Sequence, residues 1–472
     1  MTSKFPLELT NRMPRGAWMA GAILLTTLVP LQQPQAAAKS PLPFICMYGH
    51  SDNAGVTDAF RKLVPRINVI EGTSRNATFI KELRKQRCIY AAHVNSPPGA
   101  SFEELVKRWT APFKDDLGGK LPGGYDAIAI DELRADVNGS KQSAIVCEAL
   151  KRTREAYPGK QIYAAATWQL GRNSRDHTEQ LEAVDRYVDV LMLEVYLRES
   201  RPSYGYIADW AGQIQAISSN LLSKTVYGLG IAQRGYLFDD STSLSYLAHL
   251  DHQFHVIRQD RRSRHMPGVM FWAYYRSQTE VLPEYLARLS QHYFHKQKTT
   301  RYGDGKPKQL VGNPQLENVS GWKLASGGGD ISLFEYKNVP SIEADHDSNG
   351  WAKHGARGLK MTRGEQPSRA STLLSGLDPQ RVHVASAWVH SDAARNGAGL
   401  RVVGRNGRVL AEQSTQRAGT GSQWDKWTRL IATFVPDGPS VKLELHDTQA
   451  RPGTTLYWDF VEAESAWPVD AR

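Results

Sequence analysis

Short apolar runs alternate with amphipathic stretches through the first part of the chain. Eight such runs lie between Pro43 and Tyr275, and short apolar runs bounded by turn residues are typical of strands buried on both faces. Between them, the stretch Asp176–Tyr187 is one clear helical pattern. Eight βα units over about 250 residues predict an α/β fold, a (β/α)8 TIM barrel. An open doubly wound sheet is the alternative, but no Gly-rich fingerprint follows the first run. The runs are Phe44–Tyr48, Ile67–Ile70, Ile89–Val94, Ala127–Asp131, Ile162–Trp168, Val188–Tyr196, Val226–Ala232 and Val269–Tyr275.

The pattern changes after a last predicted helix, Glu284–His295. The polar stretch Lys296–Gln309 predicts a linker, and the following strand-like runs are separated by Gly, Pro, Asp and Asn turns. Many short strands without an intervening helix predict an all-β sandwich of the jelly-roll kind. These runs are Val382–His390, Leu400–Val403, Trp427–Val435, Val441–His446 and Thr455–Glu462. We therefore expect a catalytic barrel over residues 39–295, a linker over 296–310 and a sandwich over 311–472.

The N-terminus has the composition of a secretory signal. Lys4, Arg12 and Arg15 precede the apolar stretch Ala17–Leu31, and the small residues Ala36–Ala38 follow. We expect residues 1–38 to be removed, which makes the protein secreted or periplasmic. A retained N-terminal anchor is the alternative. No later segment is apolar enough for a membrane span, so none is expected in the mature chain.

Two of the apolar runs end on carboxylates, Asp131-Glu132 in the fourth and Glu194 in the sixth. The C-terminal ends of barrel strands open onto the mouth where catalytic groups lie, and two acids there suit glycoside hydrolysis. Alternation places Asp131 and Glu194 on the inner face. We expect Asp131 or Glu132 to be the general acid and Glu194 the nucleophile or base. The alternative is that these acids cap helices or pair with arginines.

Other side chains at the strand ends are candidates for substrate binding. Aromatic rings stack on the apolar faces of sugars, although such rings also serve as core residues. The predicted substrate-binding residues are Tyr48, His50, His93, Trp168, Tyr196, Trp272 and Tyr274. His50 and His93, together with Glu71 after the second run, also raise a metal-dependent phosphodiesterase. That class needs an acid pair after the second strand, which Glu71-Gly72-Thr73 does not supply.

With the strands assigned, the first half resembles the chitinase-like glycoside hydrolase family 18. The family's fourth strand carries Asp-x-x-Asp-x-Asp-x-Glu; Asp126 and Asp131 match its first and third acids, Ala129 and Leu133 replace the other two, and Glu132 comes one residue early. The family's Met-x-Tyr motif and terminal Trp are matched by Met192 to Tyr196 and by Gly268–Trp272. The departures imply a divergent hydrolase rather than a true chitinase.

The second half resembles the β-sandwich carbohydrate-binding modules found beside such barrels. Asn313–Glu317 with Gly321-Trp322 is similar to their opening strand, Val382–His390 to an inner strand, and Leu456–Val461 to their closing strand. The resemblance implies that Glu317 and Asp459 help to hold a structural calcium ion, for which oxygen donors are suited. The alternative is that both are surface acids near strand ends.

Charge and cysteine content restrict the remaining classes. The net charge is +10, but residues 311–472 carry 18 basic and 18 acidic residues, and no basic helix or zinc-finger pattern indicates nucleic-acid binding. The spacing of Cys46, Cys88 and Cys147 matches no metal motif; one disulfide and free thiols are both open. We expect no catalytic cofactor and a monomer.

The sequence thus leads to two functional hypotheses. The first is an exported O-glycosyl hydrolase acting on a polysaccharide or oligosaccharide. The second is a non-catalytic carbohydrate-binding or cell-envelope protein on a decayed barrel, motivated by the imperfect fourth-strand motif.

Overall fold

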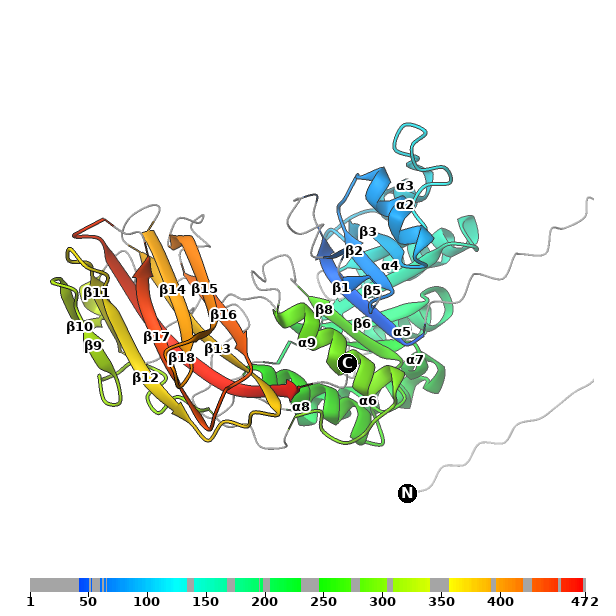
Figure 1. The fold of residues 1–472 in the computed structure, drawn as a ribbon. Coiled ribbons are helices and arrows are strands. Elements are labelled where there is room, and N and C mark those ends of the chain that lie inside the picture. The colour runs from blue at the N-terminus through cyan, green and yellow to red at the C-terminus, as the bar shows by residue number, and fades with distance from the viewer. Residues whose placement is uncertain are drawn as a thin grey trace, which may run out of the picture.

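The protein folds into an eight-stranded parallel barrel followed by a β-sandwich (Figure 1). The computed structural model describes residues 42–50, 52, 60–61, 63–64, 66–133, 140–167, 175–194, 196–197, 204–230, 246–272, 281–303, 309–339, 356–391, 396–418, 427–448 and 451–469. The predicted signal segment, Trp168 and Tyr274 lie outside these residues. The predicted fold class, an α/β barrel followed by an all-β sandwich, is confirmed.

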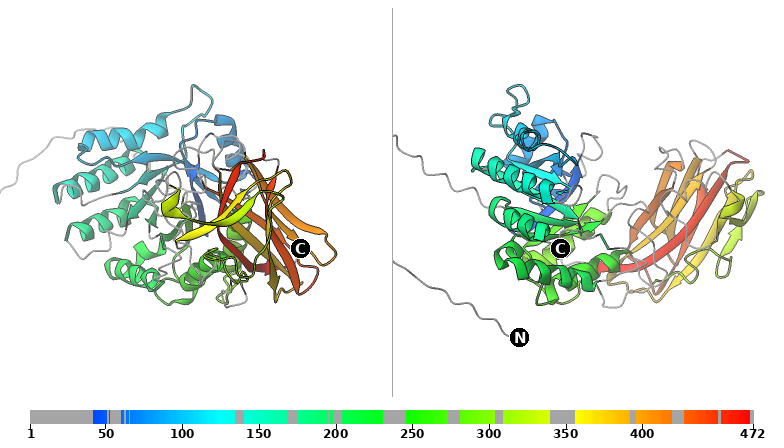
Figure 2. Two further views of the ribbon diagram at one scale, coloured as in Figure 1. Left: turned by 90° about the vertical axis from the view of Figure 1, so that its left-hand side faces the viewer. Right: turned by 180° about the vertical axis from the view of Figure 1, so that it is seen from behind.

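The barrel closes because β1 pairs with both β2 and β8, and the other strands pair in chain order. Helices cover its outside (Figure 2). The strands are β1 Phe44–His50, β2 Val69–Gly72, β3 Ile89–Asn95, β4 Ala127–Asp131, β5 Gln161–Thr167, β6 Val190–Glu194, β7 Thr225–Gly230 and β8 Gly268–Trp272. The helices are α2 Ala77–Lys85, α3 Phe102–Lys114, α4 Ser140–Ala156, α5 Arg175–Tyr187, α6 Gly205–Ile217, α7 Ser219–Ser223, α8 Tyr246–Gln259 and α9 Val281–Ser290, with the π-helix η3 Gln291–His295 continuing α9.

Side-chain alternation separates the barrel interior from the helix-facing layer. Ala127 and Ala129 join the interior cluster, whereas Ile128 and Ile130 pack with the helices, as the sequence predicts. Met192 likewise faces inward between two outward leucines. Residues at the C-terminal ends that keep the inward phase therefore point toward the barrel mouth.

The sandwich consists of two five-stranded antiparallel sheets around one apolar core. One sheet has the order β10-β11-β18-β13-β16 and the other β15-β14-β17-β12-β9. Its strands are β9 Lys323–Ala325, β10 Asp330–Glu335, β11 Arg357–Thr362, β12 Arg369–Ser375, β13 Arg381–Ser391, β14 Asn396–Val403, β15 Val409–Ala418, β16 Thr428–Phe434, β17 Ser440–Thr448 and β18 Thr455–Pro468; a short 3₁₀-helix, η4 Tyr336–Asn338, follows β10. The predicted opening strand Asn313–Glu317 is wrong, because this segment forms turns in which Leu316 has a φ of 52°.

The barrel and the sandwich share packed contacts. The end of β18 reaches α8 and α9 (Figure 1), where the Trp467 ring stacks on Tyr285 with centroids 5.8 Å apart. The Leu247 amide donates to Glu464 Oε1 at 3.1 Å. The middle of the predicted linker is also bound to α8, since Asp251 accepts the Tyr302 and Gly303 amides.

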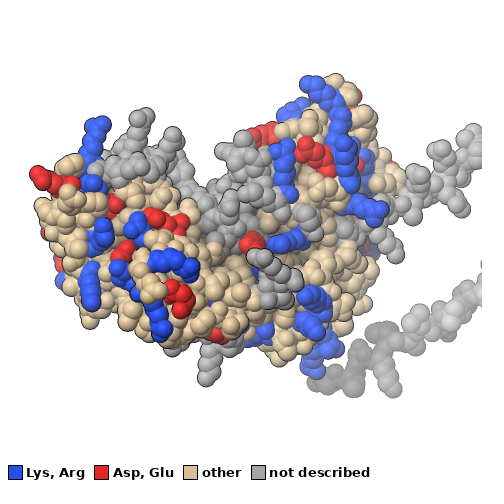
Figure 3. Space-filling model, viewed as in Figure 1, with Lys and Arg blue, Asp and Glu red and all other residues tan. Residues whose placement is uncertain are grey.

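On the face that Figure 3 shows, Lys and Arg side chains predominate over the barrel, whereas the sandwich displays both signs of charge. This agrees with the equal numbers of acidic and basic residues after position 310. Among the helices of the described residues, none combines the length and apolarity of a membrane span.

Candidate active site

The acid at the end of β4 is held by a tyrosine from β1. Asp131 continues the inward phase of Ala127 and Ala129, and Tyr48 continues that of Phe44 and Cys46. The Tyr48 hydroxyl donates to Asp131 Oδ1 at 2.6 Å. Tyr48 is only 3 % exposed, whereas the Asp131 side chain is 27 % exposed and so remains reachable from the mouth.

A second acid, Glu71 on β2, lies behind this pair and is 1 % exposed. Its Oε2 accepts the Gly49 amide at 2.7 Å, and its Oε1 lies 2.6 Å from Nδ1 of His93. The other ring nitrogen of His93 lies 3.9 Å from Asp131 Oδ2, an ion-pair distance. The sequence predicts His93 as a substrate-binding residue but gives Glu71 a role only in the phosphodiesterase alternative. Glu71 lies two residues after Val69, so strand alternation places both side chains in the barrel interior. This alternation is the sequence signal that would have predicted Glu71 as a site residue.

Electrostatics couple Glu71 to His93. Burial raises the pKa of Glu71, although the hydrogen bond from His93 opposes this shift. The hydrogen bond with Glu71 raises the pKa of His93, and the nearby Asp131 charge adds to it, while burial acts in the opposite direction. The arrangement favours an imidazolium between two carboxylates.

The acid at the end of β6 lies beside two aromatic rings. The Tyr196 hydroxyl donates to Glu194 Oε1 at 3.2 Å. The Tyr196 ring stacks on Trp272 of β8, with centroids 4.9 Å apart and planes 24° apart. Glu194, Tyr196 and Trp272 are all partly exposed, so this group combines a carboxylate with an aromatic surface.

The two groups lie around a common region of the mouth. Burial raises the pKa of Tyr48, and the carboxylates of Glu71, Asp131 and Glu194 raise it further. Burial likewise raises the pKa of Tyr196, with added contributions from Glu194, Asp131 and Glu71. Because both tyrosines respond to the same three carboxylates, the charges from β2, β4 and β6 converge on one end of the barrel.

Other predicted site residues are placed differently. Glu132 begins the loop after β4 with a φ of 46° and an exposed side chain. His50 does not point into the mouth: it is 2 % exposed, stacks on Phe79 of α2 and lies 3.2 Å from the Tyr90 hydroxyl. Gly49, at φ 98°, interrupts the regular pairing of β1 and turns His50 toward the helices.

Glu317 and Asp459 of the sandwich both lie near Tyr336. Asp459 is fully buried and accepts the Tyr336 hydroxyl and the Phe460 amide, and Glu317 Oε1 accepts the Ala356 amide at 2.6 Å. Both residues influence the Tyr336 phenol electrostatically. Calcium requires six to eight oxygen ligands. Over the described residues no group of three or more His, Cys, Asp or Glu side chains is arranged for a metal ion, so the calcium site stays a prediction.

No protein-family model and no curated protein matches the chain. Solved structures resemble its parts. A class V chitinase from Pseudomonas fluorescens is 11 % identical, with 49 % of this chain and 95 % of that chain covered and a TM-score of 0.38. The spore cortex-lytic enzyme SleL from Bacillus megaterium is 11 % identical, covering 53 % and 75 % with a TM-score of 0.34. The carbohydrate-binding module TmCBM61, solved with β-1,4-galactotriose, is 13 % identical and covers 34 % and 99 % with a TM-score of 0.27. Likenesses this distant assign no function, which must be argued from the site.

Proposed function

We propose that this chain is an exported glycoside hydrolase that cleaves O-glycosidic bonds of a polysaccharide at the barrel mouth. The observation that carries the proposal is a chain of contacts that joins the two acids. Tyr48 donates to Asp131 and pairs with Trp272 of the neighbouring strand. Trp272 stacks on Tyr196, which donates to Glu194. Two carboxyl groups at one site supply the acid and the nucleophile or base that glycoside hydrolysis requires. The stacked Tyr196 and Trp272 offer an aromatic surface for a sugar ring.

In the proposed reaction Asp131 is the general acid and Glu194 acts at the anomeric carbon. Asp131 gives its proton to the glycosidic oxygen while the bond from C1 to that oxygen breaks. Glu194 either attacks C1 directly or takes a proton from the water that attacks it. One water is consumed in both cases, its hydroxyl ending on C1 and its other proton returning to the carboxyl pair. Glu132 is the alternative acid.

The stereochemistry of the product distinguishes the two roles of Glu194. A nucleophilic carboxylate lies about 5 Å from the acid and retains the anomeric configuration, whereas a base at about 6.5 Å or more inverts it. Proton NMR of the first product released therefore decides between them.

The proposal is tested by incubating the purified protein with neutral, amino and acidic polysaccharides and measuring reducing ends. For the sugar that is cleaved, Asp131→Asn and Glu194→Gln should each lower kcat by about 10²–10⁴-fold with little change in binding or Tm. Asp126→Asn is the matched control, because Asp126 precedes the same strand at its opposite end, where it pairs with Arg84 at 2.6 Å. Its activity per folded protein should equal that of the wild type.

Other outcomes reassign the function or the roles. Binding without release of reducing ends identifies a carbohydrate-binding protein. A fully active Glu194→Gln enzyme removes Glu194 from the mechanism. If Glu132→Gln abolishes turnover and Asp131→Asn does not, Glu132 is the acid.

A further inference from the structure

Glu71 is a fully enclosed acid whose two oxygens both have donors from the barrel itself. Gly49 of β1 donates its amide to Oε2, and His93 of β3 faces Oε1 at 2.6 Å. A buried carboxylate is costly unless such partners compensate it. The short contact with His93 uses one ring nitrogen, so the other is directed away from Glu71 by the geometry of the imidazole.

That other nitrogen, Nε2, lies 3.9 Å from Asp131 Oδ2. The second Asp131 oxygen accepts the Tyr48 hydroxyl at 2.6 Å. His93 therefore lies between a buried acid and a mouth acid. The strand register supports this position, because His93 pairs with Ala129, whose small side chain leaves the imidazole beside Asp131 rather than displaced from it.

We propose that Glu71 and His93 are positioning residues for Asp131: the buried Glu71 orients His93 so that its Nε2 faces the Asp131 carboxyl group. This proposal rests on the proposed function, because the role of Asp131 as the general acid comes from there. In this role the pair acts through Asp131.

The chemical consequence concerns the charge that forms during the reaction. When Asp131 gives its proton to the glycosidic oxygen, it becomes a carboxylate. The His93 ring already faces that carboxyl group, so in its protonated form it stabilises the carboxylate as it forms without having to move. Glu71 keeps the cation in place and balances its charge when no proton has moved. Tyr48 holds the second oxygen, so the carboxyl plane is fixed from two sides.

The pair also predicts a pH dependence. The groups that face His93 are Glu71 from β2, Asp131 from β4 and the Tyr48 ring from β1, 6.3 Å away. The hydrogen bond with Glu71 raises the pKa of His93. The imidazolium is therefore favoured beyond its ordinary pH range and is lost as the pH rises through this raised value, so activity should fall on the alkaline side.

The test combines NMR titration of the His93 ring with kinetics on the sugar identified above. In Glu71→Gln the His93 titration should move to lower pH, and the alkaline limb of kcat should move with it. Glu71→Gln and His93→Gln should each lower kcat by about 10–100-fold with KM unchanged, because a misplaced acid affects only the chemical step. Glu82→Gln, an exposed acid on α2 paired with Arg61, is the matched control and should change neither quantity.

The titration is independent of turnover and separates the two proposals. Asp131→Asn should also lower the titration point of His93 at pH values where Asp131 is ionised, because it removes the carboxylate that faces the ring. If both titration shifts occur but the wild type cleaves no polysaccharide, the placement of His93 between Glu71 and Asp131 is supported and the hydrolase proposal fails. If the wild type cleaves a polysaccharide but Glu71→Gln leaves the titration and kcat unchanged, the positioning proposal is overturned.

Discussion

Two histidines at the ends of β1 and β3 are tuned in opposite directions by their surroundings. His93 contacts the carboxylate of Glu71, which raises the pKa of its ring. His50 is enclosed by Phe60, Phe79 and Tyr90, and burial lowers the pKa of His50 from 6.5 to about 4. The same residue type thus has its protonated form favoured inside the barrel mouth and is a neutral packing residue behind it.

His50 should make the fold sensitive to acid. Above pH 6.5 neither the folded nor the unfolded state protonates His50, but between pH 6.5 and 4 the unfolded state binds a proton that the folded state excludes. Stability is therefore lost as the pH falls through this window, by up to about 3 kcal/mol. In His50→Gln, urea unfolding at pH 7 and pH 4.5 should show a smaller difference than in the wild type. An unchanged difference, equal to that of the exposed His295→Gln control, would contradict this.

At the residue scale, alternation predicts which way a side chain points but not which distant side chain it meets. Asp131 and Glu194 follow the phase of their strands, so the sequence predicts their placement at the mouth. The predicted position of His50 at the mouth is wrong, because Gly49 shifts the inward–outward alternation of β1 by one residue. A positive φ at glycine cannot be predicted from the hydrophobic pattern. Glu71 was considered only for the phosphodiesterase class; the structure extends β2 to Gly72, so that Glu71 shares the inward phase of Val69.

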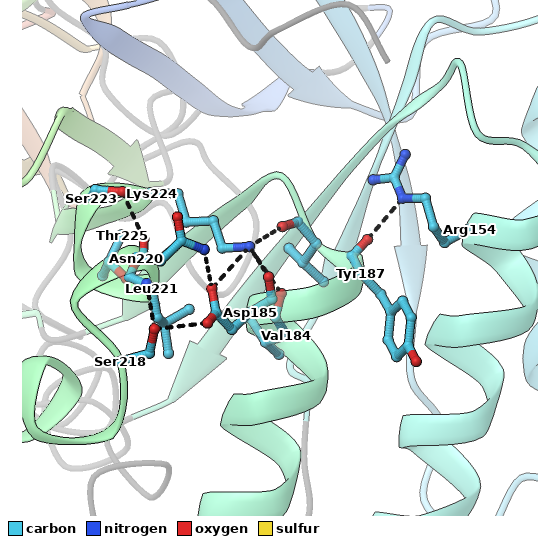
Figure 4. A network of polar contacts seen from close by, with 11 residues as sticks. Arg154, Val184, Asp185, Tyr187, Ser218, Asn220, Leu221, Ser223, Lys224 and Thr225 are labelled. Atoms are coloured by element: carbon cyan, nitrogen blue, oxygen red, sulfur yellow. Dashed lines mark hydrogen bonds and ion pairs between the residues drawn. The ribbon is translucent and has the colours of Figure 1, made fainter. Parts of the chain in front are cut away.

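At the element scale, the end of α5 is fixed by basic side chains at the base of the barrel. The Lys224 ammonium donates to the carbonyls of Asp185 and Val188, the latter at 2.9 Å, and pairs with the Asp185 carboxylate (Figure 4). Arg154 of α4 donates to the Tyr187 carbonyl at 3.1 Å. These donors satisfy carbonyls that the helix leaves free at its C-terminus. The helix end is thereby tied to the start of β7, which Lys224 directly precedes.

Lys224→Met should destabilise the protein by about 1–3 kcal/mol, because it keeps the apolar stem but leaves several carbonyls without their donor. The measurement is the free energy of unfolding in urea. Lys151→Met is the matched control: Lys151 lies on α4 with a side chain 42 % exposed and a 3.9 Å ion pair to Glu148. Its effect should stay within about 0.5 kcal/mol. Equal effects of the two changes would show that the carbonyl contacts of Lys224 do not stabilise α5.

The order of the barrel elements could be predicted from the sequence, because eight apolar runs alternate with helical patterns. The predicted helix Asp176–Tyr187 corresponds to α5, and the fourth run coincides with β4. The prediction of the sandwich was less complete, because it did not include β9 to β12 or β15. Several of these strands are largely exposed, such as the three residues of β9, so their apolar signal is weak.

At the scale of the whole molecule, the barrel and the sandwich share a packed core. Val384, Ala466 and Trp467 of the sandwich belong to the same apolar cluster as the barrel helices. Sequence patterns predict each part separately, because periodicity reports burial and not the identity of the covering surface. We therefore expect the wild type to unfold in one thermal transition, with the sandwich held at a fixed orientation beside the barrel.

Trp467, near the end of β18, contributes an aromatic contact to this coupling. It is 5 % exposed, its ring stacks on Tyr285, and the Arg288 guanidinium lies 5.2 Å above it. Trp467→Ala removes a large aromatic contact between the parts, so calorimetry should show two transitions, or one transition destabilised by about 3–5 kcal/mol. Val469→Ala, at the exposed end of the same segment, should behave as the wild type. A single transition for Trp467→Ala at the Tm of Val469→Ala would mean that the polar contact of Leu247 with Glu464 and the remaining apolar residues hold the parts together without Trp467.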